Sequence, residues 1–296
     1  MTAKTRVLHR AGCALALVAA LAASGCGVTA AINNAVDPAA EAATVAHAAL
    51  QTGHVTGFRI SATFMVSING SSQRDDITGV MDTRNGIQDL VNRERDGKRM
   101  VSIRELVRGG RVFLNLRGLP GTAHKLGSRP WIEYDVGRSE GVKDPSVHYN
   151  PAEFVDFLRT PGMRVHALAS QAVDGVPATL YRADVDLDRY VRAAPRRLRA
   201  STRRLVRYVE RAVGSHVLPE DVWVDGSGLI RQLSWGYEEC VEGSNVSMGM
   251  LIDLSDFGAQ RVARLPAASH TRDITPQIRA SLSQAEQMQA GCGGSA

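Results

Sequence analysis

The sequence predicts an α+β fold in which one curved antiparallel sheet carries helices against one face. The first observation is a regular alternation over residues 58–68, where Phe, Ile, Ala and Val take every second position. A period of two over this length is typical of a strand with one dry face. The second is a set of glycine-containing hairpin signals at residues 109–110, 174–175 and 225–228. The third is the lack of strand–helix–strand alternation, which disfavours a parallel sheet.

Seven further segments are predicted as strands or hairpins, because each shows weaker alternation or a turn signal at its centre. They are residues 76–85, 86–95, 100–116, 129–137, 163–187, 221–239 and 245–258. The polar run NGSSQRDD, residues 69–76, is expected to interrupt the sheet after the first strand.

Three helical segments are predicted from capping residues and apolar spacing. Asp37, followed by a proline, offers an N-cap for a helix over residues 39–52. Asn150 begins a second, short helix in the manner of a capping box. Residues 187–214 contain nine arginines, and Pro195 is expected to kink or divide this helical region. The expected inner face of the region consists of Leu198, Leu205, Val209 and Val213.

The N-terminus has the pattern of a secretory signal peptide. Residues 1–10 contain three basic residues and no acid, and residues 11–23 are uncharged and apolar. Thirteen apolar residues are too few to span a hydrocarbon core of about 30 Å as a helix. We therefore predict that residues 1–25 are removed from the mature protein.

The end of this segment, Ala23-Ser24-Gly25-Cys26, resembles a bacterial lipobox, although the usual first residue is Leu. The resemblance implies that the Cys26 thiolate takes a diacylglyceryl group and that cleavage occurs just before it. Residues 26–36 would then form a lipidated tether that holds the protein on the extracytoplasmic face of the cell membrane. The alternative is an ordinary cleavable signal in which Cys26 occurs by chance.

The charge balance gives no support for a nucleic-acid partner. Residues 1–25 hold three of the 35 Lys and Arg residues and no acid. The mature chain therefore has 32 basic and 30 acidic residues, a formal charge of +2. Part of the basic character of the full chain belongs to the signal peptide.

Two cysteines remain once Cys13 is removed with the signal and Cys26 is acylated. Outside the cytoplasm, Cys240 and Cys292 are expected to pair, which closes a loop of 53 residues. Loop entropy gives such a bond about 4 kcal/mol. Two free thiols are the alternative.

The order of several segments resembles the mycobacterial LppX/LprG-type lipoproteins and their actinobacterial relatives. The segments are the lipobox, the alternating strand, "PWIEYDV", "NPAEFVDFL", "VDGVPATLYRADVDLDRY" and "LPEDVWVDGSGLIRQL". High use of Arg and Ala, typical of GC-rich genomes, agrees with an actinobacterial source. The similarity covers residues 37–258 beyond the tether, and residues 259–296 would form an extension that the disulfide holds.

This resemblance implies a LolA/LolB-like fold, an unclosed β half-barrel with helices packed on its concave face. It also implies that the hollow binds an acylated lipid or glycolipid and carries it across the envelope. The candidate cavity residues lie on the predicted dry faces and on the second helix. They are Phe58, Ile60, Phe64, Val66, Ile132, Tyr134, Phe154, Phe157, Met248, Met250 and Ile252. The alternative for each of them is an ordinary place in a filled core.

The sequence offers no recognisable catalytic or metal-binding motif. It lacks G-x-S-x-G, S-x-x-K and H-E-x-x-H, so we expect no enzyme activity and no cofactor. Asp184, Asp186 and Asp188 resemble the start of a calcium loop, but the later glycine and glutamate are missing. We interpret them as the wet face of a strand and expect no metal.

Two questions stay open at this stage. Four arginines at helical spacing, Arg192, Arg196, Arg199 and Arg203, either face anionic lipid or form a solvated helix face. A structural or signalling lipoprotein with a filled core and an unknown protein partner is the alternative to a lipid carrier.

Overall fold

The computed structural model describes residues 37–277 apart from short gaps. The gaps are residues 97–98, 120–126, 128, 136–150, 197–198, 200–201, 204–205, 208, 211–213 and 242–243. The chain divides into two compact units, residues 1–35 and 36–296, and every described residue lies in the second. The signal peptide, Cys26, the tether and Cys292 lie outside the described residues, as does the side chain of Cys240. Lipidation and the disulfide therefore stay predictions.

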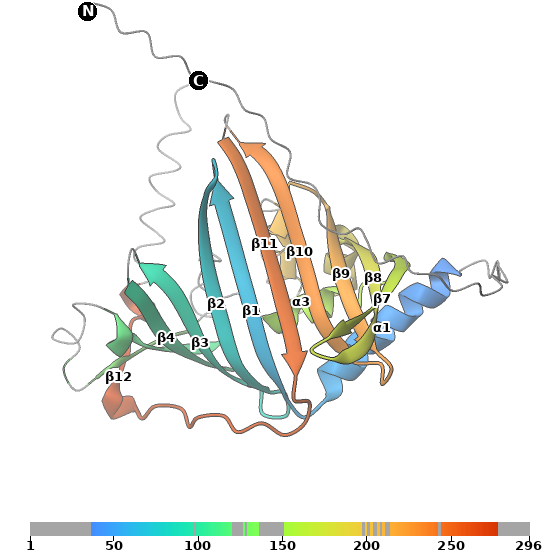
Figure 1. Cartoon of the computed structure of the whole chain (residues 1–296). Helices are drawn as coiled ribbons and strands as arrows, with labels where there is room; N and C mark the ends of the chain where they lie inside the picture. The colour runs from blue at the N-terminus through green and yellow to red at the C-terminus, as the bar shows by residue number, and fades with distance from the viewer. Residues whose placement is uncertain are drawn as a thin grey trace, which may run out of the picture. The chain divides into compact units, whose positions relative to one another are not determined.

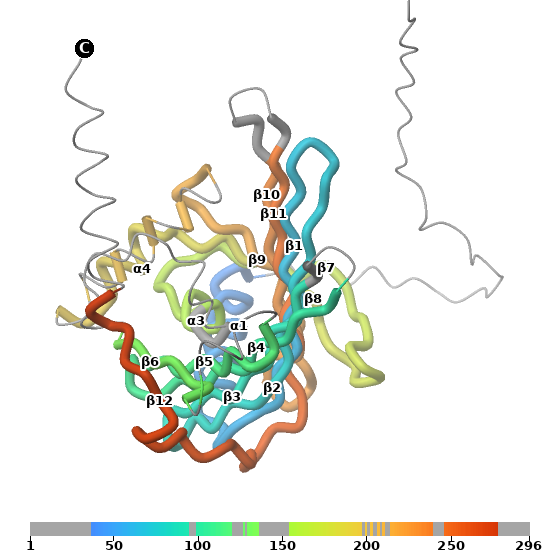
Figure 2. The backbone as a smooth tube through the Cα atoms, turned by 90° about the vertical axis from the view of Figure 1, so that its left-hand side faces the viewer, coloured from blue at the N-terminus to red at the C-terminus, as the bar shows by residue number. Residues whose placement is uncertain are grey.

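Twelve strands form one sheet whose two ends do not meet. The order across the sheet is β12-β6-β5-β4-β3-β2-β1-β11-β10-β9-β8-β7, so β12 and β7 are its edges. The strands are β1 (Phe58–Ile68), β2 (Ser71–Asp82), β3 (Ile87–Asp96), β4 (Arg99–Arg108), β5 (Arg111–Asn115), β6 (Trp131–Asp135), β7 (Arg164–Val173), β8 (Val176–Asp186), β9 (Val217–Asp225), β10 (Ile230–Val241), β11 (Ser244–Ser255) and β12 (Thr271–Asp273). Figures 1 and 2 show that the sheet is strongly curved. The predicted unclosed, mostly antiparallel sheet is confirmed.

Helices occupy the inside of the curve, as predicted. Figure 2 shows α1 (Pro38–His54) and α3 (Pro151–Phe157) within the hollow of the sheet. Asp37 caps α1 as expected, because its Oδ1 accepts a hydrogen bond of 2.9 Å from the Ala39 amide. The buried side of α1, with Val45 and Ala49, packs in the same apolar core as the sheet. Further helical elements are α4 (Leu187–Ala193) and the 3-10 turns η1 (Leu116–Gly118) and η3 (Ala268–His270), and described residues within 199–210 and 275–277 are helical as well.

The first hairpin corrects one expectation. The polar run 69–76 does not interrupt the sheet, because Asn69 and Gly70, with φ of 50° and 82°, make a tight turn between β1 and β2. Pairing continues without a break from Ile68–Ser71 to Phe58–Met81. The polar side chains of this run therefore belong to a strand.

The chain after β11 joins the same sheet. Gly258 donates to the Gly57 carbonyl at 2.8 Å, and Ala263 donates to Asp89 Oδ2 at 2.9 Å. The chain then adds β12 parallel to β6, which is the one parallel pairing among the described strands. Residues 258–273 thus cross the outer side of β3 and complete one edge of the sheet (Figure 1).

Pro195 divides the arginine-rich region, as the sequence predicts. α4 ends at Ala193, and Ala194 takes an extended ψ of 141° just before the proline. Arg199 lies beyond this break and donates to the carbonyls of Arg192 and Ala194 at 3.2 and 3.3 Å. The four arginines therefore do not form one continuous helix face. Of the expected inner residues, Val209 is buried together with Val206, while Leu198, Leu205 and Val213 lie outside the described residues.

The β9–β10 hairpin is organised by one buried carboxylate. Asp225 Oδ1 accepts from the Ser227 and Leu229 amides at 2.8 and 3.0 Å, and its Oδ2 accepts from Arg231 Nε at 2.6 Å. Burial alone would raise the pKa of Asp225, but these hydrogen bonds outweigh it and lower the pKa. The guanidinium of Arg231 also lies 4.7 Å over the ring of Phe257.

We expect Asp225→Ala to lower the free energy of unfolding by about 2–4 kcal/mol, because it leaves several donors without an acceptor. Urea unfolding of the variant and the parent protein measures this loss. The control is Asp184→Ala, which breaks an exposed ion pair with Arg164 and should cost less than about 1 kcal/mol. Equal losses in the two variants would contradict the role given to Asp225.

Candidate functional site

The strand register places all the predicted cavity residues of the sheet on one face. Phe64 lies opposite Met250, and Val66 lies opposite Met248. The pairing continues in phase from Ile60 through β2, β3, β4 and β5 to Ile132 on β6. This shared face is the concave one, because it packs against the helices inside the curve.

One end of the concave face is a closed apolar core. Phe58, Ile60 and Ile252 are buried there. From α3, Phe154 and Phe157 close over the sheet and pack edge to face, with ring centroids 5.7 Å apart. These five predicted residues are buried in the apolar core.

The other end of the same face is open. Phe64, Val66 and Met248 are half-buried, and Ile68, the next residue in phase on β1, is 51% exposed. Tyr237, which pairs with Met248, is half-buried as well. Figure 2 shows the β1–β2 and β10–β11 hairpins projecting beyond their neighbours at this end. An apolar strip therefore runs out of the core onto a surface that is only partly covered.

The remaining predicted residues sit between these two ends. Met250 is buried in the same transverse row as Phe64. On β6, Tyr134 is buried and Ile132 is half-buried. Burial raises the pKa of the Tyr134 phenol, and the nearby negative charge of Glu105 raises it further. This phenol stays protonated at neutral pH.

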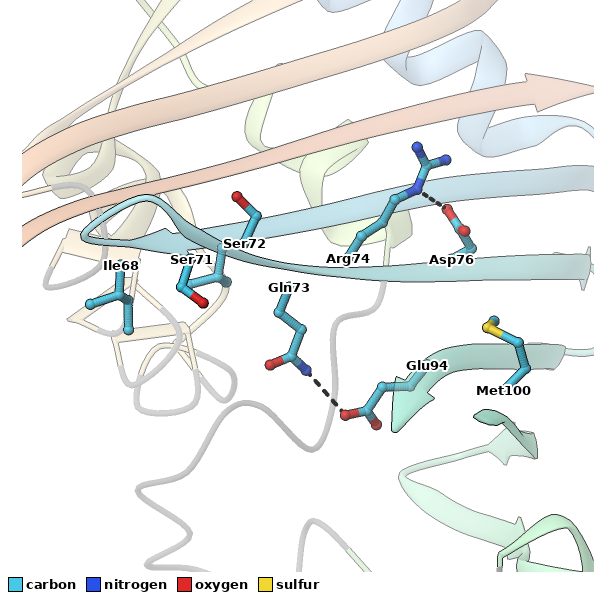
Figure 3. Close-up of a pocket in the computed structure, with 9 residues that line it drawn as sticks. Ile68, Ser71, Ser72, Gln73, Arg74, Asp76, Glu94 and Met100 are labelled. Atoms are coloured by element: carbon cyan, nitrogen blue, oxygen red, sulfur yellow. Dashed lines mark hydrogen bonds and ion pairs between the residues drawn. The ribbon is translucent and has the colours of Figure 1, made fainter. Parts of the chain in front are cut away.

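A cavity of about 830 Å³ opens where β2 separates from β3. The β2–β3 ladder begins at the pair Asp75–Glu94, so residues 71–74 extend past it. The lining residues are Val66, Ile68, Ser71, Ser72, Gln73, Arg74, Asp76, Glu94 and Met100. Figure 3 shows Gln73 reaching towards Glu94 on one side of β2, while Arg74 pairs with Asp76 on the other. The volume is within the range of small-molecule sites.

Polar side chains that the sequence reading missed lie on the concave face beside this cavity. Gln73 Nε2 donates to Glu94 Oε1 at 3.1 Å. Asp75 Oδ1 and Asn92 Oδ1 are buried without a hydrogen-bond partner. Burial raises the pKa of Asp75, a hydrogen bond from Gln73 opposes this, and the charge of Asp76 raises it again. The sequence signal was the Asn69-Gly70 turn, which continues the alternation into the polar run.

A second missed residue is Glu220 on β9. Its side chain is 1% exposed and alternates in phase with the buried Leu218 and Val222. Neither carboxyl oxygen has a hydrogen-bond partner. Burial in apolar surroundings raises the pKa of Glu220 well above its ordinary value. The alternation in "LPEDVWVD" was the available signal, because it puts this glutamate on the dry face.

The described residues give no sign of a metal centre. Among residues 37–277, outside the gaps, no three His, Cys, Asp or Glu side chains are grouped to hold a metal ion. Asp184 pairs with Arg164 at 3.3 Å, and Asp186 caps α4 by accepting from the Arg189 amide at 2.8 Å. Within the described part of the chain, no helix is both long and apolar enough to cross a membrane.

Solved structures similar to this chain include two mycobacterial lipoproteins. LppX from Mycobacterium tuberculosis is 11% identical with a TM-score of 0.44, and the match covers 77% of this chain and 100% of LppX. LprF from Mycobacterium bovis is 13% identical with a TM-score of 0.42, covering 78% and 98% of the two chains. A chain in the MucA/MucB complex from Pseudomonas aeruginosa is 13% identical with a TM-score of 0.28, covering 78% of this chain and 59% of that chain.

LppX-type lipoproteins, which the sequence resembles, are thus among the structural neighbours of this chain. No protein-family model matches the sequence, and no curated protein matches it either.

The buried Glu220 predicts a pH-dependent stability. In the unfolded chain this carboxyl loses its proton near its ordinary pKa, whereas the folded protein keeps the proton to higher pH. Its contribution therefore falls as pH rises above the ordinary value, by at most about 1.4 kcal/mol per pH unit, until the folded pKa is reached.

Glu220→Gln removes this titration. Its free energy of unfolding relative to the parent should increase as the pH is raised from about 5 to about 8. Urea unfolding at several pH values measures the difference, and Glu220→Leu, which also cannot titrate, should show the same trend. A difference that stays constant over this range would contradict the assignment.

Proposed function

We propose that this protein is an extracytoplasmic lipoprotein, anchored to the cell membrane through Cys26, that binds an acylated lipid or glycolipid in its hollow. Transport of that lipid across the envelope is the function that such a carrier would perform. It acts without catalysis and without a cofactor.

The observation that carries the proposal is the apolar strip that leaves the core at the open end of the concave face. Phe64, Val66 and Met248 lie half-buried along it, and Ile68 continues it into solvent. Water in contact with such a strip costs free energy of about 25 cal/mol per Å² of apolar surface. An acyl chain laid along the strip would remove that contact. The adjacent cavity supplies a volume suited to part of a lipid.

A structural or partner-binding lipoprotein with a filled core is the second candidate. The closed end favours it, because Phe157 and Ile252 are wholly buried and Phe154 covers Trp235 there. The two candidates differ in whether the open end takes up an apolar ligand.

Mass measurement separates them. Residues 27–296, which contain the whole compact unit, would be purified from a related actinobacterium. The intact mass is then recorded under native and denaturing conditions. Extra native mass that is lost on denaturation, and found as acyl lipid in an organic extract, is the expected result. A native mass equal to that of the polypeptide alone, together with no uptake of an apolar fluorescent probe, would favour the filled core.

A larger side chain on the apolar strip should weaken ligand binding. Val66→Trp fills the half-buried strip, and we expect it to weaken binding of the fluorescent probe N-phenyl-1-naphthylamine by about tenfold. The matched control is Met65→Trp, on the same strand but on the opposite, exposed face. Equal affinities in the two variants would place the probe elsewhere.

The anchor has a separate test. Cys26→Ser removes the thiol that lipidation requires, so the protein should move from the membrane fraction to the soluble fraction. Intact mass of the parent protein should exceed that of its polypeptide by a diacylglyceryl group and any further acyl chain. A parent protein that is already soluble, with no added mass, would favour an ordinary signal peptide.

A further inference from the structure

Several polar atoms without partners lie in one transverse row of the concave face. The register defines the row: Glu94 pairs with Asp75, Asp75 with Phe64, Phe64 with Met250, Met250 with Trp235, and Glu220 with Ala183. The β9–β10 ladder ends at the pair Ser234–Asp221, and Trp235 and Glu220 are the next residues beyond that end on β10 and β9. The row therefore runs from the cavity at β2 to the covered centre of the sheet.

Glu220 and Trp235 lie in the buried part of this row. Among the described residues, nothing hydrogen-bonds to either carboxyl oxygen of Glu220 or to the indole Nε1 of Trp235. Their side chains are 1% and 7% exposed. The Trp235 ring stacks on Phe154 at 5.5 Å, and the neighbour of Glu220 on β8 is the small Ala183. An indole donor and a carboxyl group are thus both buried just beyond the end of the β9–β10 ladder.

Leaving these buried groups without protein hydrogen-bond partners is costly. A buried polar group that loses its hydrogen bond costs about 1–3 kcal/mol, and nearly all such groups in native proteins have a partner. An apolar pair at these two positions would avoid the cost. A bound molecule that forms hydrogen bonds with both groups would explain why they are buried without protein partners.

We propose that Glu220 and Trp235 bind the polar linkage of a neutral acyl lipid, an ester carbonyl next to a free hydroxyl group. The Trp235 N–H donates to the carbonyl oxygen, and the Glu220 carboxyl exchanges a hydrogen bond with the hydroxyl. The acyl chain then follows the apolar strip past Val66 and Met248 towards the open end. This inference rests on the proposed lipid binding and specifies the class of lipid.

The charges along the row favour a neutral ligand over an anionic one. Asp75 and Glu94 lie in the same row, and its described residues include no Lys or Arg. A phosphate or a free carboxylate would meet like charges and no cation at this depth. Burial raises the pKa of Glu220 and so favours its neutral carboxyl form, which both donates and accepts hydrogen bonds.

The test compares two ligands that share one acyl chain. Residues 27–296 are refolded from denaturant to remove lipid acquired during expression. They are then loaded with N-phenyl-1-naphthylamine, which has neither a carbonyl nor a hydroxyl group. Monoolein, a neutral hydroxylated ester, and oleate, its anionic acid, are titrated in to displace the probe at about pH 7. The readout is the affinity for monoolein divided by the affinity for the probe. A variant that weakens all ligand binding lowers both affinities and leaves this ratio unchanged.

We expect monoolein to displace the probe at about tenfold lower concentration than oleate. Glu220→Leu and Trp235→Phe should each lower the monoolein ratio by about tenfold, since each removes one hydrogen-bonding partner. Trp235→Phe retains an aromatic ring against Phe154. Glu220→Gln should recover most of the ratio, because an amide also donates and accepts. The control is Asp221→Asn, the next residue on β9, which faces outward and pairs with Arg182.

Two results would overturn the inference in different ways. If the probe binds and the monoolein ratio is the same in the parent and all variants, Glu220 and Trp235 do not bind the ligand, while lipid binding itself stands. If neither the probe nor monoolein binds the parent protein, lipid binding fails and this inference fails with it.

Discussion

An open sheet with one apolar face requires a cover, and the cover here is incomplete. α1 and α3 pack inside the curve, and Phe154 of α3 stacks on Trp235 of the sheet. Phe157 extends that contact to Tyr190 at 4.7 Å. The hairpins β1–β2 and β10–β11 are longer than this cover and continue beyond it (Figure 2). The partly exposed strip at Phe64, Val66 and Met248 follows from this mismatch in length.

The same constraint explains where polar groups enter the concave face. Three polar residues lie where the apolar strip opens and β2 separates from β3: Gln73, Asp75 and Glu94. Some of their atoms form hydrogen bonds there, such as that from Gln73 to Glu94. Glu220 lies under the cover and has none. On the outer face, charged side chains form ion pairs between neighbouring strands, such as Arg182–Asp221 and Arg104–Asp89.

Much of the strand layout could be read from local patterns, and the errors have local causes. The turns at 109–110 and 174–175 are where the sequence placed them, because positive φ angles there favour glycine. The polar composition of residues 69–76 predicts a break in the sheet, whereas the Asn69-Gly70 turn keeps β1 and β2 paired throughout. Glu220 was missed although its phase with Leu218 and Val222 was visible, since a carboxylate in a dry face contradicts the usual burial rule.

The sequence by itself determined which side chains share a face, because a period of two is a property of each strand alone. It also determined the hairpin turns and the end of α4 before Pro195. Only the tertiary structure decided how much of the concave face is covered and which polar groups are left beneath the cover. That outcome depends on pairings between distant segments, such as Arg59 with Ser255, and on the lengths of hairpins relative to helices. No local pattern contains those quantities, so the open end and the row through Glu220 emerge only in the folded molecule.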